Sequence, residues 1–263
     1  MLGKIVKIMF GAAAVAFLLG PLVAILPLGF TSSSFLTYPM PGWSMKWLQE
    51  LFVADSWRRS IINSLIISGG TTLLATTLGT MAALGLRHKG IMLAAPIRTL
   101  FILPMVVPAV VLGVGMQLLF TRLGIANTYM GVIVAHTIVA IPLVLISVSG
   151  SLAGIDGRLE LAAESLGAAP FTVFRTVTLP LAMPGVASGA VLAFATSLDE
   201  VVLTLFVAGP NQRTLARQMF STIRENISPT IASAAFLFIV ATIVIGMATV
   251  VFKKRVKKLS AAA

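Results

Sequence analysis

Two adjacent carboxylates, Asp199 and Glu200, lie about midway through a stretch of sequence that is otherwise apolar and long enough to cross a membrane. A carboxylate inside a bilayer is costly unless it faces a partner, water or a cationic cargo. Neighbouring residues point about 100° apart around a helix, so the two cannot both face one narrow pore. We therefore expect one carboxylate to line a route for a cation and the other to pair within the helix bundle, with Ser197 and Thr204 extending either network. The alternative is a structural polar cluster that holds two membrane chains together.

Residue types exclude most other chemistry. The chain has no cysteine, which rules out disulfides, thiolate catalysis, cysteine zinc sites and iron–sulfur clusters. A haem or metal site would need a second intramembrane histidine beside His136, and the other histidine, His88, falls in a loop. We interpret His136 as a hydrogen-bonded packing residue. No HExxH motif or other catalytic constellation occurs, so we predict no catalytic residue and no metal site.

The elements that position these residues are predicted to be membrane-spanning helices. Hydrophobic residues make up 58% of the chain and charged residues only 10%, against about a quarter charged in soluble domains. Stretches of about 18 or more residues without charge are needed to cross roughly 30 Å of hydrocarbon. Six stretches qualify, at about 8–30, 61–86, 99–120, 130–150, 185–208 and 231–252. The composition predicts an all-α polytopic membrane protein with one transmembrane domain over residues 1–263, in which Pro104 and Pro108 permit a kink in the third span.

The distribution of Lys and Arg predicts the orientation. Twelve of the 19 basic residues fall on the side of the two termini and seven fall on the other side. This bias places both termini, and the loop between the fourth and fifth spans, in the cytoplasm. Five of the twelve form a C-terminal cluster that suits a membrane surface with anionic lipid: Lys253, Lys254, Arg255, Lys257 and Lys258. The net charge of +11 therefore indicates a lipid surface and not nucleic acid.

The loop between the fourth and fifth spans, residues 151–184, is predicted to form two short helices. The first has one apolar stripe at helical spacing: Leu159, Ala162, Ala163 and Leu166. Asp156 suits its N-cap, and Gly167 suits a left-handed turn at its C-terminus. Pro170 then suits the first position of a second helix, in which Phe171 and Phe174 share a face. Leu179-Pro180 is expected to end that helix.

This loop has the composition of a docking surface for a soluble partner. Small side chains at Ala162, Ala163 and Gly167 allow close approach of another surface, and the two phenylalanines can insert into it. The alternative interpretation is an ordinary connecting or re-entrant loop.

The loop also resembles the EAA loop of ATP-binding-cassette importer permeases. That pattern is Glu-Ala-Ala, three residues, Gly, about nine residues, a branched aliphatic residue, one residue, then Leu-Pro. Six positions match in register: Ala162, Ala163, Gly167, Val177, Leu179 and Pro180. One position departs, because Leu161 stands where the motif has its glutamate, with Glu160 before it and Glu164 shortly after.

Residues 197–202 (SLDEVV) and 206–210 (FVAGP) are similar to spermidine/putrescine importer permeases of the PotC and PotI type. The resemblance implies the six-helix fold of type I importer permeases. It also implies that the EAA helices seat in a cleft of a separate ATPase subunit, whose ATP-driven closure in a dimer switches the permeases between inward-open and outward-open states. The residues that would make that contact are Glu160, Ala162, Ala163, Glu164, Gly167, Phe171, Phe174, Leu179 and Pro180.

Further partners follow from the same resemblance. They are a second permease chain, homologous but different, and a periplasmic or extracellular substrate-binding protein. The chain has no Walker A pattern, so ATP and Mg²⁺ must be bound by the ATPase partner, and no cofactor is expected in this chain.

These features together predict a transport subunit of a bacterial inner-membrane importer that hydrolyses nothing itself. The implied cargo is a polyamine, whose ammonium groups Asp199 and Glu200 could receive through charge-assisted hydrogen bonds. Two alternatives stay open. The cargo could be another small organic solute, such as an aminophosphonate, an amino-acid-like or an opine-like compound. Less favoured is an ion-coupled secondary transporter, which the EAA-like loop and the lack of an evident inverted repeat argue against.

Overall fold

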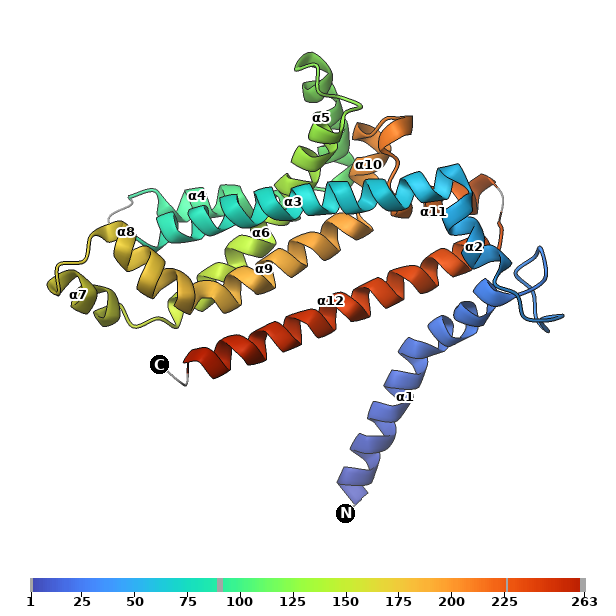
Figure 1. Ribbon diagram of the computed structural model, residues 1–263, viewed down its shortest axis with the longest axis horizontal. Helices are drawn as coiled ribbons and strands as arrows, with labels where there is room; N and C mark the ends of the chain where they lie inside the picture. The colour runs from blue at the N-terminus through green and yellow to red at the C-terminus, as the bar shows by residue number, and fades with distance from the viewer. Residues whose placement is uncertain (1, 89–91, 226, 261–263) are drawn as a thin grey trace. The chain divides into compact units, whose positions relative to one another are not determined.

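The chain folds into α-helices joined by short turns. The computed structural model describes residues 2–88, 92–225 and 227–260, with the backbone alone at residue 2 and from residue 248 onward. The helices in these ranges are α1 (Leu2–Ile25), α2 (Lys46–Val53), α3 (Asp55–Arg87), α4 (Ala94–Ile102), α5 (Ala109–Arg122), α6 (Tyr129–Ala153), α7 (Arg158–Ser165), α8 (Pro170–Val173), α9 (Leu179–Asp199), α10 (Val202–Val207), α11 (Leu215–Glu225) and α12 (Thr230–Ser260) (Figure 1). The side chains of the predicted C-terminal basic cluster lie outside the described residues.

The helices form two compact units. One consists of Met1–Arg58 and Gln218–Thr242, and the other of Arg59–Arg217 and Ile243–Ala263. The predicted site residues all belong to the second unit.

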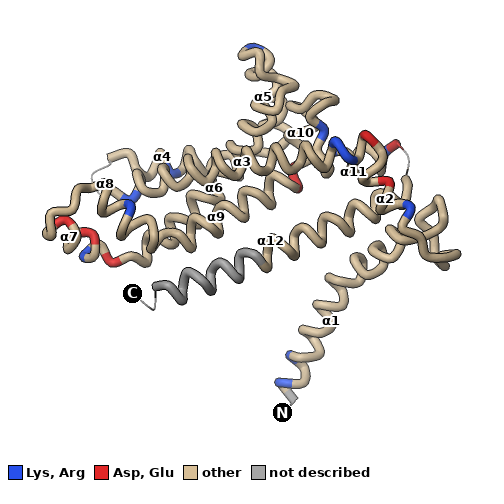
Figure 2. The backbone as a smooth tube through the Cα atoms, in the orientation of Figure 1, with Lys and Arg blue, Asp and Glu red and all other residues tan. Residues whose placement is uncertain are grey.

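The predicted spans are largely confirmed. Five helical stretches within the described residues are long and apolar enough to cross a bilayer: Gly3–Phe30, Asp55–Arg87, Tyr129–Ala153, Pro170–Asp199 and Thr230–Met247. The third predicted span, at about 99–120, is a broken one, because Ala94–Met105 and Ala109–Arg122 meet at an angle of 99°. The bend contains Pro104 and Pro108, which confirms the predicted kink. The middles of α6 and α9 carry no charged residue (Figure 2).

In the first unit, the turn after α1 packs closely against the start of α12. The Ser233 hydroxyl donates to the carbonyl oxygen of Gly29 at 2.6 Å. Beside it, the rings of Phe30 and Phe236 meet edge to face, with centroids 5.1 Å apart. A β-carbon on Gly29 would lie 2.8 Å from the Ser233 backbone nitrogen, so only glycine permits this approach.

In the second unit, α6 and α9 pack against each other through small residues. A stripe on α9 at four-residue spacing is buried: Gly185, Gly189, Ala193 and Ser197. The Ser147 hydroxyl of α6 donates to the Gly185 carbonyl at 3.0 Å. Small residues at this spacing let two membrane helices approach until their backbones touch, and α9 is thereby fixed to α6 along its length.

We expect Gly185→Ala to destabilise the fold. The added β-carbon would lie 2.8 Å from the Ser147 carbonyl oxygen, so the helices must separate or shift, at a cost of about 1–3 kcal/mol. The matched control is Gly150→Ala in α6, where nothing lies within 4 Å of the new β-carbon. The thermal midpoint of the purified chain in detergent should fall for Gly185→Ala and stay level or rise for Gly150→Ala. Equal midpoints would contradict the close packing.

The second helix of the 151–184 loop does not end at Leu179-Pro180, and this prediction was wrong. The chain stays helical from Pro170 through a π-helical turn, Phe174–Thr178, into α9, so the Leu-Pro step begins α9. Pro180 has no N–H to continue a regular helix. It is tolerated because the π turn rearranges the preceding hydrogen bonds and because proline fits the first turn of a helix.

Candidate functional site

The predicted site residues form two groups, one at each end of α9. The coupling residues lie at the beginning of α9 and in the two short helices before it. The acidic pair lies where α9 ends. Because α9 has 21 residues and a helix rises 1.5 Å per residue, about 30 Å separates the two groups.

The first group exposes several large apolar side chains to solvent. None of the residues of α7 is buried, and Leu161, Leu166 and Phe171 have exposed fractions of 62%, 89% and 72%. Ala162, at the second motif position, is exposed too, and Ala163 is half-buried. We call Leu161, Leu166 and Phe171 the docking patch. Leu161, at the position where the motif has its glutamate, therefore contributes apolar surface.

Local geometry at this end follows the sequence in part. The N-cap of α7 is Gly157 and not Asp156 as predicted, but the Asp156 carboxylate, one residue earlier, accepts the first-turn N–H of Arg158 at 2.9 Å. Gly167 has φ +84°, confirming the left-handed turn after α7. The rings of Phe171 and Phe174 lie 6.4 Å apart, with Phe174 half-buried. Of the remaining coupling residues, Glu164 and Pro180 are exposed and Leu179 is half-buried.

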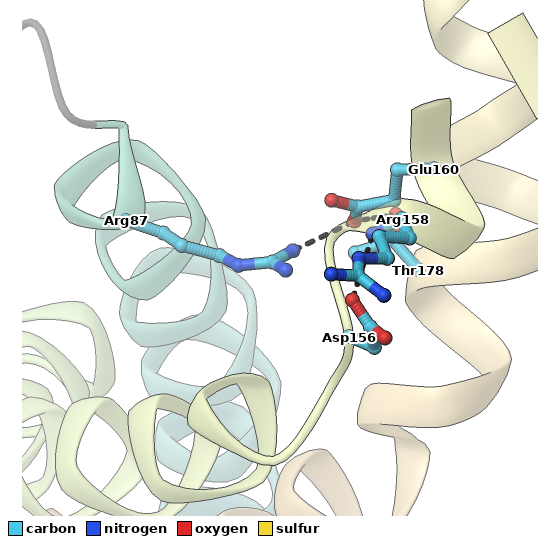
Figure 3. A network of polar contacts seen from close by, with 5 residues as sticks. All are labelled: Arg87, Asp156, Arg158, Glu160 and Thr178. Carbon is cyan, nitrogen blue, oxygen red and sulfur yellow. Dashed lines mark hydrogen bonds and ion pairs between the residues drawn. The ribbon is translucent and has the colours of Figure 1, made fainter. Parts of the chain in front are cut away.

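Glu160 has a different environment from its neighbours on α7. One carboxylate oxygen, Oε1, accepts a hydrogen bond from Arg87 at the end of α3 and another from the Thr178 hydroxyl in the π turn, each at 2.6 Å (Figure 3). The Arg87 and Glu160 side chains are only 28% and 23% exposed. We call this three-residue arrangement the brace. Arg87 and Thr178 were not predicted as site residues, because 73 and 18 positions separate them from Glu160.

The electrostatics favour the charged form of Glu160. Burial alone would raise its pKa, but the hydrogen bonds from Thr178 and Arg87, and the charges of Arg87 and His88, lower the pKa below its ordinary value of 4.5. A carboxyl whose pKa is lowered on folding stabilises the fold above its ordinary pKa and loses that contribution as the pH falls through the lowered pKa. The brace is therefore intact at neutral pH and is lost only in acid below about pH 4.5.

At the other end of α9, the two carboxylates have separate surroundings. Asp199 is the last residue of α9 and its side chain is exposed. No hydrogen bond or ion pair joins its carboxylate to any other residue that the structure describes. The Glu200 carboxylate accepts the Leu203 N–H at 2.9 Å and so caps the start of α10. The sequence predicted one continuous helix through both residues, and the structure corrects this, because the chain is extended at Glu200 and α10 begins anew at Val202.

Ser197 and Thr204 are buried on either side of this break. His136 of α6 bonds to both, with Nδ1 2.9 Å from Ser197 Oγ and Nε2 3.0 Å from Thr204 Oγ1. The Thr204 hydroxyl donates its single proton to the Glu200 carbonyl at 2.9 Å, so it must accept from Nε2–H, and Nδ1 then accepts from Ser197. His136 is thus the hydrogen-bonded packing residue that the sequence predicted. Its two bonds tie α9 and α10 to α6 across the break.

Two further contacts hold α10. Arg217 donates to the carbonyl oxygens of Thr204 and Ala208 at 3.0 and 2.7 Å, which satisfies carbonyls at the end of the helix. A β-carbon on Gly113 of α5 would lie 2.5 Å from the Phe206 ring, so α5 and α10 are in direct contact. No pattern in the sequence indicated either contact. Among the described residues, no group of three His, Asp or Glu side chains is placed to hold a metal ion.

Residues 75–258 match the family of binding-protein-dependent transport system inner membrane components. The chain belongs to this family. It is a membrane-embedded permease subunit of an ATP-binding-cassette importer, not an enzyme, as the EAA-like loop predicted.

Curated relatives cover most of the chain. The spermidine/putrescine permease PotC of Escherichia coli K12 is 30% identical over 249 residues, covering 95% of this chain and 94% of PotC. The putrescine permease PotI of the same strain is 33% identical over 240 residues, covering 88% of this chain and 84% of PotI. The molybdenum transport permease ModB of Mycobacterium bovis is 34% identical over 218 residues, covering 77% of this chain and 82% of ModB.

Solved structures share the fold. A bacterial ATP-binding-cassette importer of the acidic polysaccharide alginate superposes with a TM-score of 0.69 over 96% of both chains, at 14% identity. The methionine transporter MetNI, in an inward-facing conformation, gives a TM-score of 0.63 at 20% identity, covering 80% of this chain and 97% of that one. These matches confirm the predicted all-α importer-permease fold.

Proposed function

We propose that this chain is one of two permease subunits of a bacterial polyamine importer and forms part of the path for spermidine or putrescine. The observation that carries the proposal is the similarity to PotC along 95% of the chain. The exposed carboxylate of Asp199 supports it, because an anionic group at the end of a membrane helix suits a cargo that carries ammonium groups.

The first group of site residues is assigned to energy coupling. In this proposal, residues 151–184 form the coupling loop of a single permease domain, lie in the cytoplasm with both termini, and seat in a cleft of the ATPase dimer that binds ATP and Mg²⁺. The exposed docking patch supports this role, since the burial of leucine and phenylalanine side chains against a partner would stabilise the complex. Glu164, Gly167 and Phe174 complete the same surface.

The second group is assigned to the path. Asp199 meets the cargo, and Glu200, Ser197 and Thr204 hold the broken segment in which it sits. The second permease chain, homologous but different, would complete the path, and an external binding protein would deliver the cargo. The assembly resides in the bacterial inner membrane.

The test is transport by the assembled importer. The chain is purified with its partner permease and ATPase, reconstituted into vesicles with the binding protein, and supplied with labelled spermidine or putrescine. We expect uptake that requires ATP and persists when ionophores collapse the ion gradients. Uptake without ATP would instead show an ion-coupled carrier. If the vesicles take up neither polyamine in the presence of ATP, the polyamine assignment is wrong.

The similarity to ModB makes a molybdenum species the second candidate cargo. Molybdate is an anion, and the exposed carboxylate of Asp199 would repel it. We therefore expect molybdate to leave the ATPase activity of the complex unchanged where spermidine, presented by its binding protein, stimulates it. Stimulation by molybdate alone would favour the second candidate.

A further inference from the structure

The helix that carries Leu161 of the docking patch, α7, has little apolar packing to hold it in place. None of the residues of α7 is buried, although α7 lies beside α8 and the π turn. In water-exposed surroundings, few buried apolar contacts make an element easy to displace. The position of α7 must then depend on polar contacts to the rest of its unit.

The brace supplies these contacts. Among the described residues, Glu160 and Arg87 form the one ion pair that joins α7 to another helix, and Thr178 adds a second bond to the same oxygen. Through Glu160 Oε1, three segments meet at one atom: the end of α3, the coupling helix α7 and the π turn that begins α9 (Figure 3). Bonds between ionised groups at 2.6 Å are stronger than neutral ones.

A cavity lies along the brace. It has a volume of about 680 Å³ and is lined by residues of the end of α3, of α7 and of α8, including Leu84, Leu161 and Val173. Arg87, Glu160 and Thr178 all border it. Since apolar packing does not fill this space, α7 has room to move relative to α3 when the brace is absent.

We infer that Glu160 is a positioning residue, which joins α7 to α3 and α9 so that a displacement of the coupling helix moves the transmembrane helices. This inference rests on the proposed function, because it takes the displacement of α7 to be driven by an ATPase partner. The brace itself does not depend on which cargo is transported. The docking patch and the brace use adjacent residues of α7 for different purposes. Leu161, which is 62% exposed although it also borders the cavity, offers apolar surface to the partner, and Glu160 transmits the movement into the membrane.

The functional test is the number of cargo molecules imported per ATP hydrolysed by the reconstituted importer. In Glu160→Gln, the amide oxygen can still accept the hydrogen bond from Thr178, but the ion pair with Arg87 is lost. We expect the ATPase to assemble normally and hydrolyse ATP while the transport ratio falls about tenfold, as for loss of a charged hydrogen bond. The matched control is Asp156→Asn, an acidic residue of the same loop whose amide can still cap α7, and its ratio should not change.

Charge reversal tests whether Arg87 and Glu160 act as an ion pair or as two independent charges. Arg87→Glu and Glu160→Arg alone place like charges together and should each lower the ratio. The double variant restores an ion pair at the same place and should recover much of the transport ratio. Failure of the double variant to recover, or an unchanged ratio in Glu160→Gln, would overturn the inference.

A distance measurement tests the brace independently of transport. The natural chain has no cysteine, so spin labels can be placed uniquely at Ser165→Cys on α7 and Met81→Cys on α3, both exposed. In the purified full-length chain we expect a narrow distance distribution that broadens or shifts in Glu160→Gln and not in Asp156→Asn. An unchanged distribution would refute the brace. Failure of polyamine uptake in the unaltered importer would refute the proposed function and leave this measurement standing.

Discussion

Replacing Asp199 with asparagine should nearly abolish polyamine uptake while leaving the importer assembled. The substitution keeps the shape of the side chain and removes only its charge. A hydrogen bond to an ionised group contributes about 1.5–3 kcal/mol, so we expect uptake at subsaturating spermidine to fall by about ten- to a hundredfold. The measurement is the initial rate of ATP-dependent uptake by reconstituted vesicles, over a range of spermidine concentrations.

Glu200→Gln is the matched control for this prediction. The amide oxygen of glutamine can still accept the Leu203 N–H and cap α10, so uptake should stay within about twofold of the unaltered importer. Equal losses in both variants would show that the pair acts as a unit. A loss of assembly in Asp199→Asn, with uptake per assembled complex unchanged, would instead support the structural alternative in which the carboxylate holds two permease chains together.

The structure explains why the sequence could not separate the roles of these two residues. Periodicity shows that adjacent residues diverge around a helix, but it does not show that the helix ends between them. The break depends on the Glu200 side chain capping α10 and on the Thr204 hydroxyl bonding to the Glu200 carbonyl. His136, more than 60 positions away, supports both sides of the break. These are tertiary contacts, and apolar runs carry no signal for them.

The membrane spans were predictable because charge is costly in a bilayer wherever the helix packs. Five of the six runs appear as spanning-length helices, and the remaining one, the third, bends where two prolines remove backbone donors. The end of the second loop helix was mispredicted for a related reason. Proline marks a missing N–H, and the sequence does not show that a π turn before Pro180 lets the helix continue.

The brace shows the same limit at the coupling end. Motif spacing placed Glu160 in the correct region, and Arg87 was visible as the first charge after a long apolar run. Their pairing was not predictable from local pattern, since it depends on how α3 and the loop between α6 and α9 pack together. The departure at Leu161 is now understandable in physical terms. The acidic side chain of this turn is used inside the subunit, and the outward position is apolar.

The docking patch leads to the second large prediction. We expect Leu166→Asp to prevent binding of the ATPase subunit. Leu166 is 89% exposed, so an aspartate there is solvated in the free chain and should not unfold it. On docking, the new carboxylate would be buried without a partner, at a cost of several kcal/mol, and the roughly 1.5–3 kcal/mol from burying leucine would be lost.

The measurement is the amount of ATPase retained when the permease is captured from detergent extracts, together with ATP-dependent uptake. Leu166→Asp and Phe171→Asp should both lose the ATPase and all uptake, because both side chains belong to the exposed patch. Met92→Asp is the control, since Met92 is 99% exposed and lies outside the two short helices. Retention of the ATPase by both patch variants would place the ATPase-binding surface elsewhere on the chain. Loss of the ATPase in the Met92→Asp control as well would show that added charge alone weakens the assembly. Because the brace is untouched in all three variants, a loss confined to the patch would assign partner binding to the apolar face of α7 and α8 and leave transmission to Glu160.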